Sequence, residues 1–240
     1  MRGLRLGIQG VSSGGGPPMP PPPLITSILL VSPTVMAATP TGTTVVSAAF
    51  DPTPGPVLLV GIASRASNAL TGATTLTDNT SGALTWTLVK ETYLNDGVAP
   101  RRRGAVFKCA VPSVSPPTGV VLTGGQGQAL YLNMTMLEMI GGSSTITNIA
   151  PDAIDLTSGD PAATLPSVPA ANDGGILLAL GQDNSAGTAP AGSTALGTIG
   201  NTSSLRSVFC VFASGAPQVA QWVSGNTKSI GVYFAVSPAG

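Results

Sequence analysis

Short apolar runs separated by turn-forming residues make up the chain from residue 24 onward. Clusters of Gly, Pro, Asn, Asp or Ser bound each run, and none has the i, i+3, i+4, i+7 spacing of an amphipathic helix. This pattern predicts an all-β protein, and about a dozen strands so spaced are typical of a sandwich or barrel. The predicted strands cover residues 24–31, 43–50, 57–64, 84–92, 104–111, 119–123, 129–140, 176–182, 194–199, 205–213, 219–223 and 229–236.

The apolar runs repeat in a similar order on either side of residue 160. The matching segments are 56–65 with 175–184, 104–112 with 206–214, and 129–139 with 229–238. Because each half alone would leave an apolar face open, we expect halves of about 24–142 and 160–240 to pack as one jelly-roll-like β-sandwich domain, 24–240, with 145–172 as the crossover. The alternative is a coincidence among strands rich in Val and Ala.

The first 23 residues differ in kind from this body. Residues 12–23, SSGGGPPMPPPP, join a glycine swivel to a proline-rich rod, which predicts a hinge. Residues 1–11 alternate apolar and other positions like a short strand, so we expect an extended anchoring arm that adds to a partner's sheet edge or lies in a groove. The candidate anchoring residues are Arg2, Leu4, Arg5, Leu6 and Ile8. A disordered terminus is the alternative.

Composition narrows the range of functions. Ten basic and ten acidic residues cancel, so nothing indicates a nucleic-acid or anionic membrane partner. The hinge separates Arg2 and Arg5 from the apolar run 24–31, which is too short to span a bilayer, so we expect neither a signal peptide nor membrane insertion. The sequence has no histidine, which disfavours most hydrolase mechanisms and zinc sites. We expect no catalytic residues, metal or cofactor, and we expect Cys109 and Cys210 to be unpaired.

The segments VLLVGIASR, LTDNTSGALTWTLVKE and GAVFKCAVP suggest a family. In this order they resemble the β-sandwich modules of virion proteins from tailed phages and gene transfer agents, of the fibre, spike or decoration type. The head of the chain is similar to the Leu- and Gly-rich leaders of such proteins. The resemblance implies a structural role in an extracellular virion.

Exposed aromatic and basic side chains are the candidates for ligand contacts. Tyr93 and Trp222 are flat enough to stack on sugar rings, and the run Arg101, Arg102, Arg103 has the geometry to hold an anion or acidic glycan. The alternative for the arginines is a solvated loop tip.

Two further side chains and one turn raise structural questions. Trp86 alternates with Leu84 and Leu88 and is expected in the core. Residues 78–81 offer oxygens to calcium, but a turn closed by its own side chains accounts for them more simply. Glu138 lies on an apolar strand face and requires a partner, for which Arg65, Lys108 or a neighbouring subunit are the candidates.

These features predict a fibre or spike subunit of a tailed-phage-like particle. The arm and hinge would bind other virion proteins of the capsid or tail, and a homotrimer of bodies would present the sandwich to cell-surface glycan. A capsid or tail decoration or cement protein without a host ligand is the alternative, and a glycan-active enzyme is a third hypothesis.

Overall fold

Every element in the described part of the chain is a β-strand. The computed structural model describes residues 27–37, 43–68, 70–94, 101–129, 131–140, 146–156, 163–165, 174–181, 193–201, 205–213, 218–220 and 229–236, with side chains over 43–68, 70–93, 101–129 and 131–138. The described part of the chain is therefore all-β, and each recorded strand pairing is antiparallel. The arm and hinge expected over residues 1–23 lie outside these ranges.

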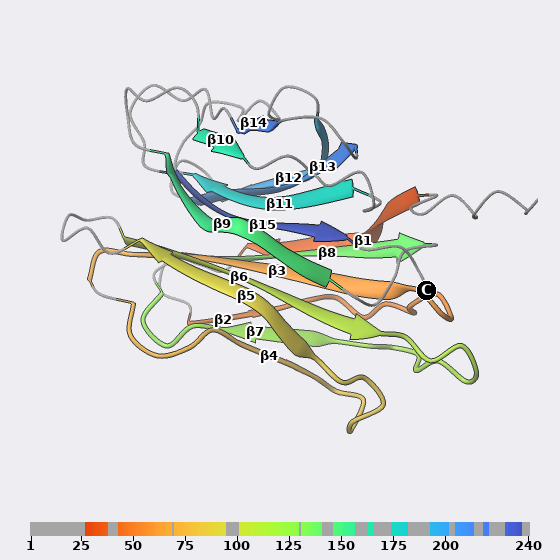
Figure 1. Ribbon diagram of the computed structural model, residues 1–240. Coiled ribbons are helices and arrows are strands. Elements are labelled where there is room, and N and C mark those ends of the chain that lie inside the picture. Colours follow the sequence, from red (N-terminus) through yellow and green to blue (C-terminus); the bar gives the residue numbers. More distant parts are fainter. Residues whose placement is uncertain are drawn as a thin grey trace, which may run out of the picture.

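The strands form three stacked layers with a further strand pair above them (Figure 1). The middle sheet has the order β1 (Ser27–Ala37), β8 (Tyr131–Ile140), β3 (Val57–Ala66), β6 (Arg101–Ala110), β5 (Thr87–Leu94). The C-terminal sheet has the order β12 (Ser193–Asn201), β13 (Leu205–Ala213), β11 (Gly174–Gly181), β15 (Ser229–Val236), β9 (Ile146–Leu156). The small sheet has the order β2 (Thr44–Val46), β7 (Leu122–Gly125), β4 (Thr75–Asp78), and β10 (Ala163–Leu165) pairs with β14 (Gln218–Ala220).

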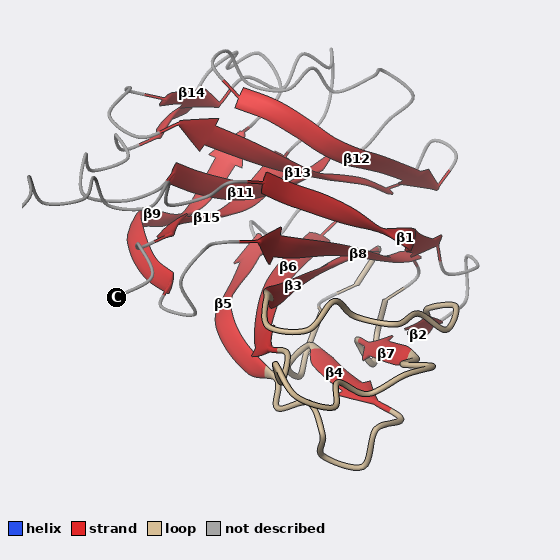
Figure 2. Cartoon of the chain, turned by 90° about the vertical axis from the view of Figure 1, so that its right-hand side faces the viewer, coloured by secondary structure: helices blue, strands red, loops and turns tan. Residues whose placement is uncertain are grey.

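The middle sheet is covered on both faces. On one side β13 lies against β3 and β8, and β15 lies against β5 and β6. On the other side the small sheet closes over it, as the view in Figure 2 also shows. A strand covered on both faces needs apolar residues at successive positions, which explains why β3 is a continuous apolar run, buried at every residue except the half-buried Arg65.

A hydrophobic core fills the space between the middle sheet and the small sheet. Leu58, Val60 and Ile62 of β3 face it, and Val45 and Leu122 close it from the small sheet. Alternate residues of β8 and β6 join the same cluster, which also receives the partly buried Trp86 and Tyr93. Trp86 therefore packs against the core, as its alternation with Leu84 predicted.

The two large sheets repeat one strand order. Read from β9, the C-terminal sheet runs β9-β15-β11-β13-β12, and the middle sheet runs β1-β8-β3-β6-β5. The segments matched in the sequence belong to β3 and β11, to β6 and β13, and to β8 and β15, which take the same places in the two orders. The contacts between the two sheets have the same symmetry. The contact of β1 with β12 has its counterpart in the contact of β9 with β5, and that of β8 with β13 has its counterpart in that of β15 with β6.

Local irregularities recur at equivalent positions. The register of β1 against β8 breaks between Leu30 and Val35, and that of β9 against β15 breaks between Asn148 and Ala153. Each break contains a proline, Pro33 or Pro151, which an edge strand tolerates because one side of it makes no ladder hydrogen bonds. β9 lies inside the segment expected as a crossover, so the strands equivalent to those of the first half start at residue 146 rather than near 160.

Cys109 belongs to the core cluster and is a free thiol. It pairs with Leu58 in register, so its side chain points toward the small sheet and away from the C-terminal sheet, where Cys210 lies on β13. Burial raises the pKa of the Cys109 thiol. This orientation agrees with the expectation that the two cysteines are unpaired.

Candidate functional site

The three consecutive arginines lie at the start of β6 and point to opposite faces of the middle sheet. Arg102 is 0% exposed on the face toward the C-terminal sheet. Arg101 and Arg103 are on the other face and are half-buried. The run therefore does not act as one basic patch, and Arg103 is the member with the most completely described contacts.

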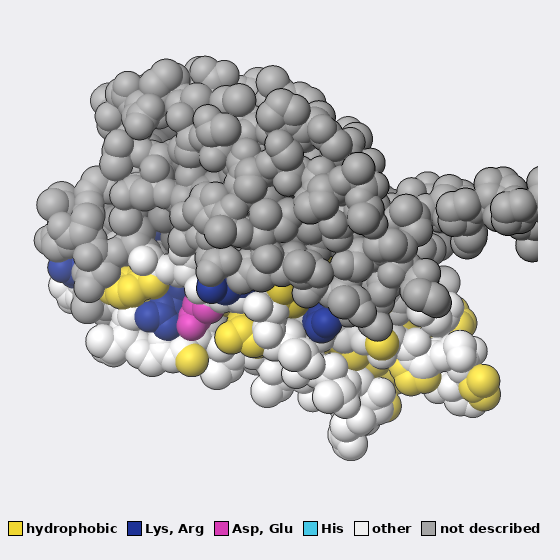
Figure 3. Space-filling view, in the orientation of Figure 1, with side chains coloured by type: hydrophobic (Ala, Val, Ile, Leu, Met, Phe, Trp, Pro, Cys, Tyr) yellow, Lys and Arg dark blue, Asp and Glu magenta, His cyan; other side chains and the backbone are white. Residues whose placement is uncertain are grey.

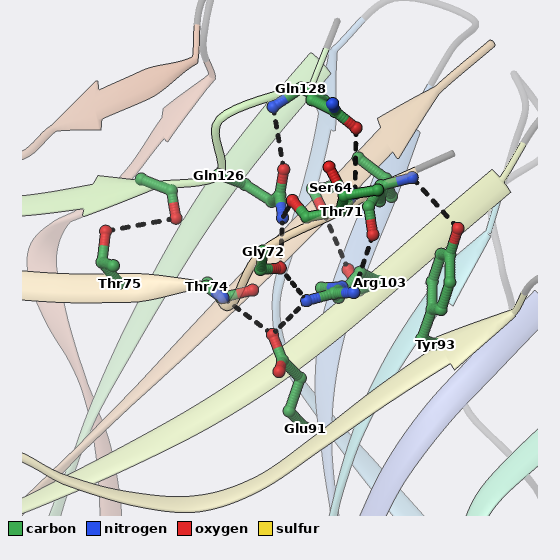
Figure 4. Close-up of polar contacts among 12 residues, drawn as sticks. Ser64, Thr71, Gly72, Thr74, Thr75, Glu91, Tyr93, Arg103, Gln126 and Gln128 are labelled. Carbon is green, nitrogen blue, oxygen red and sulfur yellow. Dashed lines mark hydrogen bonds and ion pairs between the residues drawn. The ribbon is translucent and has the colours of Figure 1, made fainter. Parts of the chain in front are cut away.

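The Arg103 guanidinium binds the backbone of residues 70–74, which we call the β3–β4 loop (Figure 4). Nη2 donates to the Leu70 carbonyl at 2.8 Å, and Nη1 donates to the Gly72 carbonyl and to Glu91 Oε1. The ion pair with Glu91 spans 3.3 Å between side chains that are 11% and 21% exposed. On the face shown in Figure 3, an acidic patch of the described part lies against basic side chains.

Tyr93 completes the support of Arg103. The guanidinium carbon lies 4.7 Å from the centroid of the Tyr93 ring, which is a cation–π distance. The Tyr93 hydroxyl accepts a hydrogen bond from the Leu70 backbone N–H at 3.0 Å. The structure thus brings together two residues singled out as ligand candidates, but their polar groups bind this protein's own loop.

Two glutamines hold the same loop from the other side. Gln126 Nε2 donates to the carbonyls of Thr71 and Gly72 at 3.3 and 3.0 Å, and the Thr71 N–H donates to Gln128 Oε1 at 2.9 Å. Gln126 Oε1 accepts the Gln128 N–H at 2.9 Å, which fixes the two glutamines relative to each other. The β3–β4 loop is therefore held from two strands, β5 and β6, and from the turn before β8.

A cleft of about 190 Å³ opens beside this loop. Its lining residues are Ala66, Ser67, Asn68 and Gln128. The lining offers one hydroxyl and two amides and no charge, so the cleft suits the neutral, hydrogen-bonding part of a ligand.

Residues 78–86 form a closed turn between β4 and β5. Asp78 Oδ1 accepts the Thr80 N–H at 2.6 Å, and Oδ2 accepts Trp86 Nε1–H at 2.7 Å. Ser81 and Gly82 have φ values of 56° and 94°, and the Ala83 N–H donates to the Thr80 carbonyl, as in a tight turn that favours glycine. Both carboxylate oxygens of Asp78 thus accept hydrogen bonds from within the turn.

Glu138 binds the loop before β3. Thr53 donates its backbone N–H to Oε1 at 2.7 Å and its hydroxyl to Oε2 at 2.9 Å. The expected partners, Arg65 and Lys108, are wrong because they pair with residues of the opposite sheet face, whereas Glu138 pairs with Leu58. Glu138 is 2% exposed, and this buried carboxylate is thereby satisfied by the hydrogen-bond donors of Thr53 rather than by a cation.

Some of the predicted site residues are not described by the structure, and two residues of the site were not predicted. The anchoring residues Arg2, Leu4, Arg5, Leu6 and Ile8, and Trp222, lie outside the described residues. Gln126 and Gln128 were missed in the sequence, although their spacing in GGQGQA places both at the turn before β8.

Within the described ranges, no group of three or more Cys, Asp or Glu residues is placed to hold a metal ion, and no helix is long and apolar enough to cross a membrane. No family model, curated protein or solved structure matches the chain.

Proposed function

We propose that this chain is a structural protein of a tailed-phage-like particle. Residues 1–11 anchor it to the capsid or tail, residues 12–23 act as a hinge, and the body presents a β-sandwich to cell-surface glycan. The protein works as a closed trimer outside the cell, in keeping with the closed point-group symmetry of most soluble homo-oligomers. Its role is structural and ligand-binding, without catalytic activity.

The order of strands in the first half is the observation that supports this proposal most. β1 pairs with β8, β2 with β7 and β3 with β6, so the pairs are nested within one another along the chain. Wrapping one long hairpin into two facing sheets, as in a jelly roll, would produce such nesting, so the pairing supports this proposal. We propose that the first half is itself a jelly-roll-like sandwich, rather than one half of a single sandwich as expected from the sequence; this fold recurs in viral capsid and lectin domains.

The use of polar side chains also supports a structural role. Arg103, Glu91, Gln126 and Asp78 bind this chain's own backbone and side chains. A glycosidase requires two carboxylates converging across a cleft, and the cleft beside the β3–β4 loop is lined by none.

One observation favours the decoration or cement alternative. The exposed positions of β2 and β4 are Thr44, Val46, Thr75 and Thr77, so the outer surface of the small sheet is uncharged there. Such a surface suits packing against another virion protein as well as it suits solvent.

Glycan-array binding by the full-length protein separates these functions. Attachment predicts saturable binding to a restricted set of surface glycans that soluble glycan competes away. Absence of binding, with normal incorporation into particles, would favour the cement role. Depolymerisation of a capsular polysaccharide by the purified protein would contradict both and support the enzyme.

A further inference from the structure

The cleft beside the β3–β4 loop lies where strand β3 ends. Ala66 is the last residue of β3, and Ser67 and Asn68 continue the chain along the cleft. Gln128 lines it from the turn before β8. Its volume of about 190 Å³ is below the roughly 300–1,000 Å³ of pockets for drug-sized ligands, so the cleft suits one small group of a larger ligand.

Three of the four lining side chains can form hydrogen bonds with a ligand. Ser67 and Asn68 are exposed, and within the described part of the chain neither side chain makes a hydrogen bond. Gln128 uses its Oε1 to accept the Thr71 N–H at 2.9 Å, so the NH₂ group is the end of this side chain that a ligand can use. One hydroxyl and two amides together offer donors and acceptors, which matches sugar hydroxyls, since each of these both donates and accepts.

The Gln128 side of the cleft is held in place by the protein itself. The Gln128 N–H donates to Gln126 Oε1 at 2.9 Å, and the Ala129 N–H donates to the Gln126 carbonyl at 3.0 Å, which closes the turn. The bond from Thr71 fixes the Gln128 amide against the β3–β4 loop (Figure 4). A side chain that is already ordered loses less entropy when a ligand binds.

The lining favours an uncharged ligand. It contains no Lys or Arg, so a carboxylate or phosphate placed here would lose hydration without gaining a cation from the lining. The nearby Arg103 guanidinium is bound to the Leu70 carbonyl of the protein's own loop. A neutral sugar ring exchanges hydrogen bonds with water for hydrogen bonds with amides and a hydroxyl, and no charge has to be buried.

We propose that this cleft is the subsite for one neutral terminal sugar residue of a surface glycan. The amides of Asn68 and Gln128 bind neighbouring hydroxyl groups of the ring, and the Ser67 hydroxyl binds a third. The inference rests on the proposed function, because it names the class of glycan and the place where the body binds it. The lining has no aromatic side chain, so a single copy binds weakly and several linked copies bind through avidity.

Ligand-observed NMR titration of the full chain tests the subsite with neutral and acidic probes. The neutral probes are the methyl glycosides of glucose, galactose and N-acetylglucosamine, and the acidic probe is glucuronate. We expect at least one neutral glycoside to bind saturably at millimolar concentration and glucuronate to bind at least about fivefold more weakly. Added salt should change the affinity for the neutral glycoside less than about twofold.

Variants locate the binding in the cleft. Gln128→Glu keeps an oxygen for the Thr71 N–H but removes the NH₂ donors, and Asn68→Asp makes the same change beside it; each should weaken the neutral glycoside at least about fivefold. Ser67→Ala should weaken it about threefold. Thr77→Ala is the matched control, because it removes a hydroxyl from an exposed position on β4 outside the lining and should leave the affinity within about twofold.

The outcomes separate the subsite from the proposed function when a glycan array is run with the same protein. Array binding restricted to acidic glycans, or wild-type affinity of both Gln128→Glu and Asn68→Asp for a neutral glycoside, would overturn the subsite and leave glycan attachment standing. Absence of binding in both assays would overturn the subsite and glycan attachment together. Thermal unfolding establishes that each variant is folded. If Gln128→Glu does not fold, Asn68→Asp decides alone, since its side chain makes no hydrogen bond within the described residues.

Discussion

Replacing Arg103 with methionine is expected to lower the free energy of unfolding by about 2–4 kcal/mol. The substitution keeps the apolar stem but removes the donors to the Leu70 and Gly72 carbonyls and leaves Glu91 without its cation. The contacts with Leu70 and Glu91 lie in partly buried positions, so water replaces them incompletely. Urea denaturation followed by circular dichroism measures the change.

Tyr93→Phe is the matched control for Arg103→Met. It keeps the ring under the guanidinium and removes only the acceptor for the Leu70 N–H, so its cost should be about 1 kcal/mol. Arg103→Lys keeps the charge without the fork and should fall between the two. If the free energy of unfolding of Arg103→Met differs from that of the wild type by less than about 0.5 kcal/mol, the network does not hold the β3–β4 loop.

Deleting residues 1–11 should leave a folded body that no longer joins the particle. The proposed hinge would separate this segment from the body, so the melting temperature of the body should hardly change. Incorporation into particles, measured as copies per particle by quantitative mass spectrometry, should fall at least about tenfold if the arm provides the strand that docks, as proposed.

Substitutions within the arm separate shape from charge. Replacing Leu4, Leu6 and Ile8 with aspartate should reproduce the deletion, because the alternating apolar positions would fill the partner's pockets. Replacing Arg2 and Arg5 with glutamine should have a smaller effect. Normal stoichiometry of the deleted protein in purified particles would show that the anchor lies elsewhere in the chain.

Most of the strands could be predicted from the sequence, because they are apolar runs bounded by turn-forming residues. The limits of β13 and β15 agree with the expected 205–213 and 229–236, because both are apolar runs bounded by turn residues. β4 and β10 were missed because they are only four and three residues long, and β9 was missed because Pro151 and two aspartates interrupt its apolar pattern. Pairing with a neighbour, rather than propensity, makes these segments strands.

The candidate site was harder to predict, because strand register decides which side chains meet. Tyr93 and Arg103 were recognised as chemically able to bind ligands, but their contacts with the β3–β4 loop depend on the pairing of β5 with β6. The same alternation separates Arg102 from Arg103 and Glu138 from Arg65. Composition identifies which residues can bind, and register determines what they face.

A cryo-electron microscopy map of the intact particle from the source organism tests the structural role most directly. The account predicts density at a regular position that fits the middle and C-terminal sheets packed face to face, joined to the capsid or tail by a narrow N-terminal segment and repeated around a threefold axis. Particles whose density is fully explained by other proteins, with this chain absent, would contradict it.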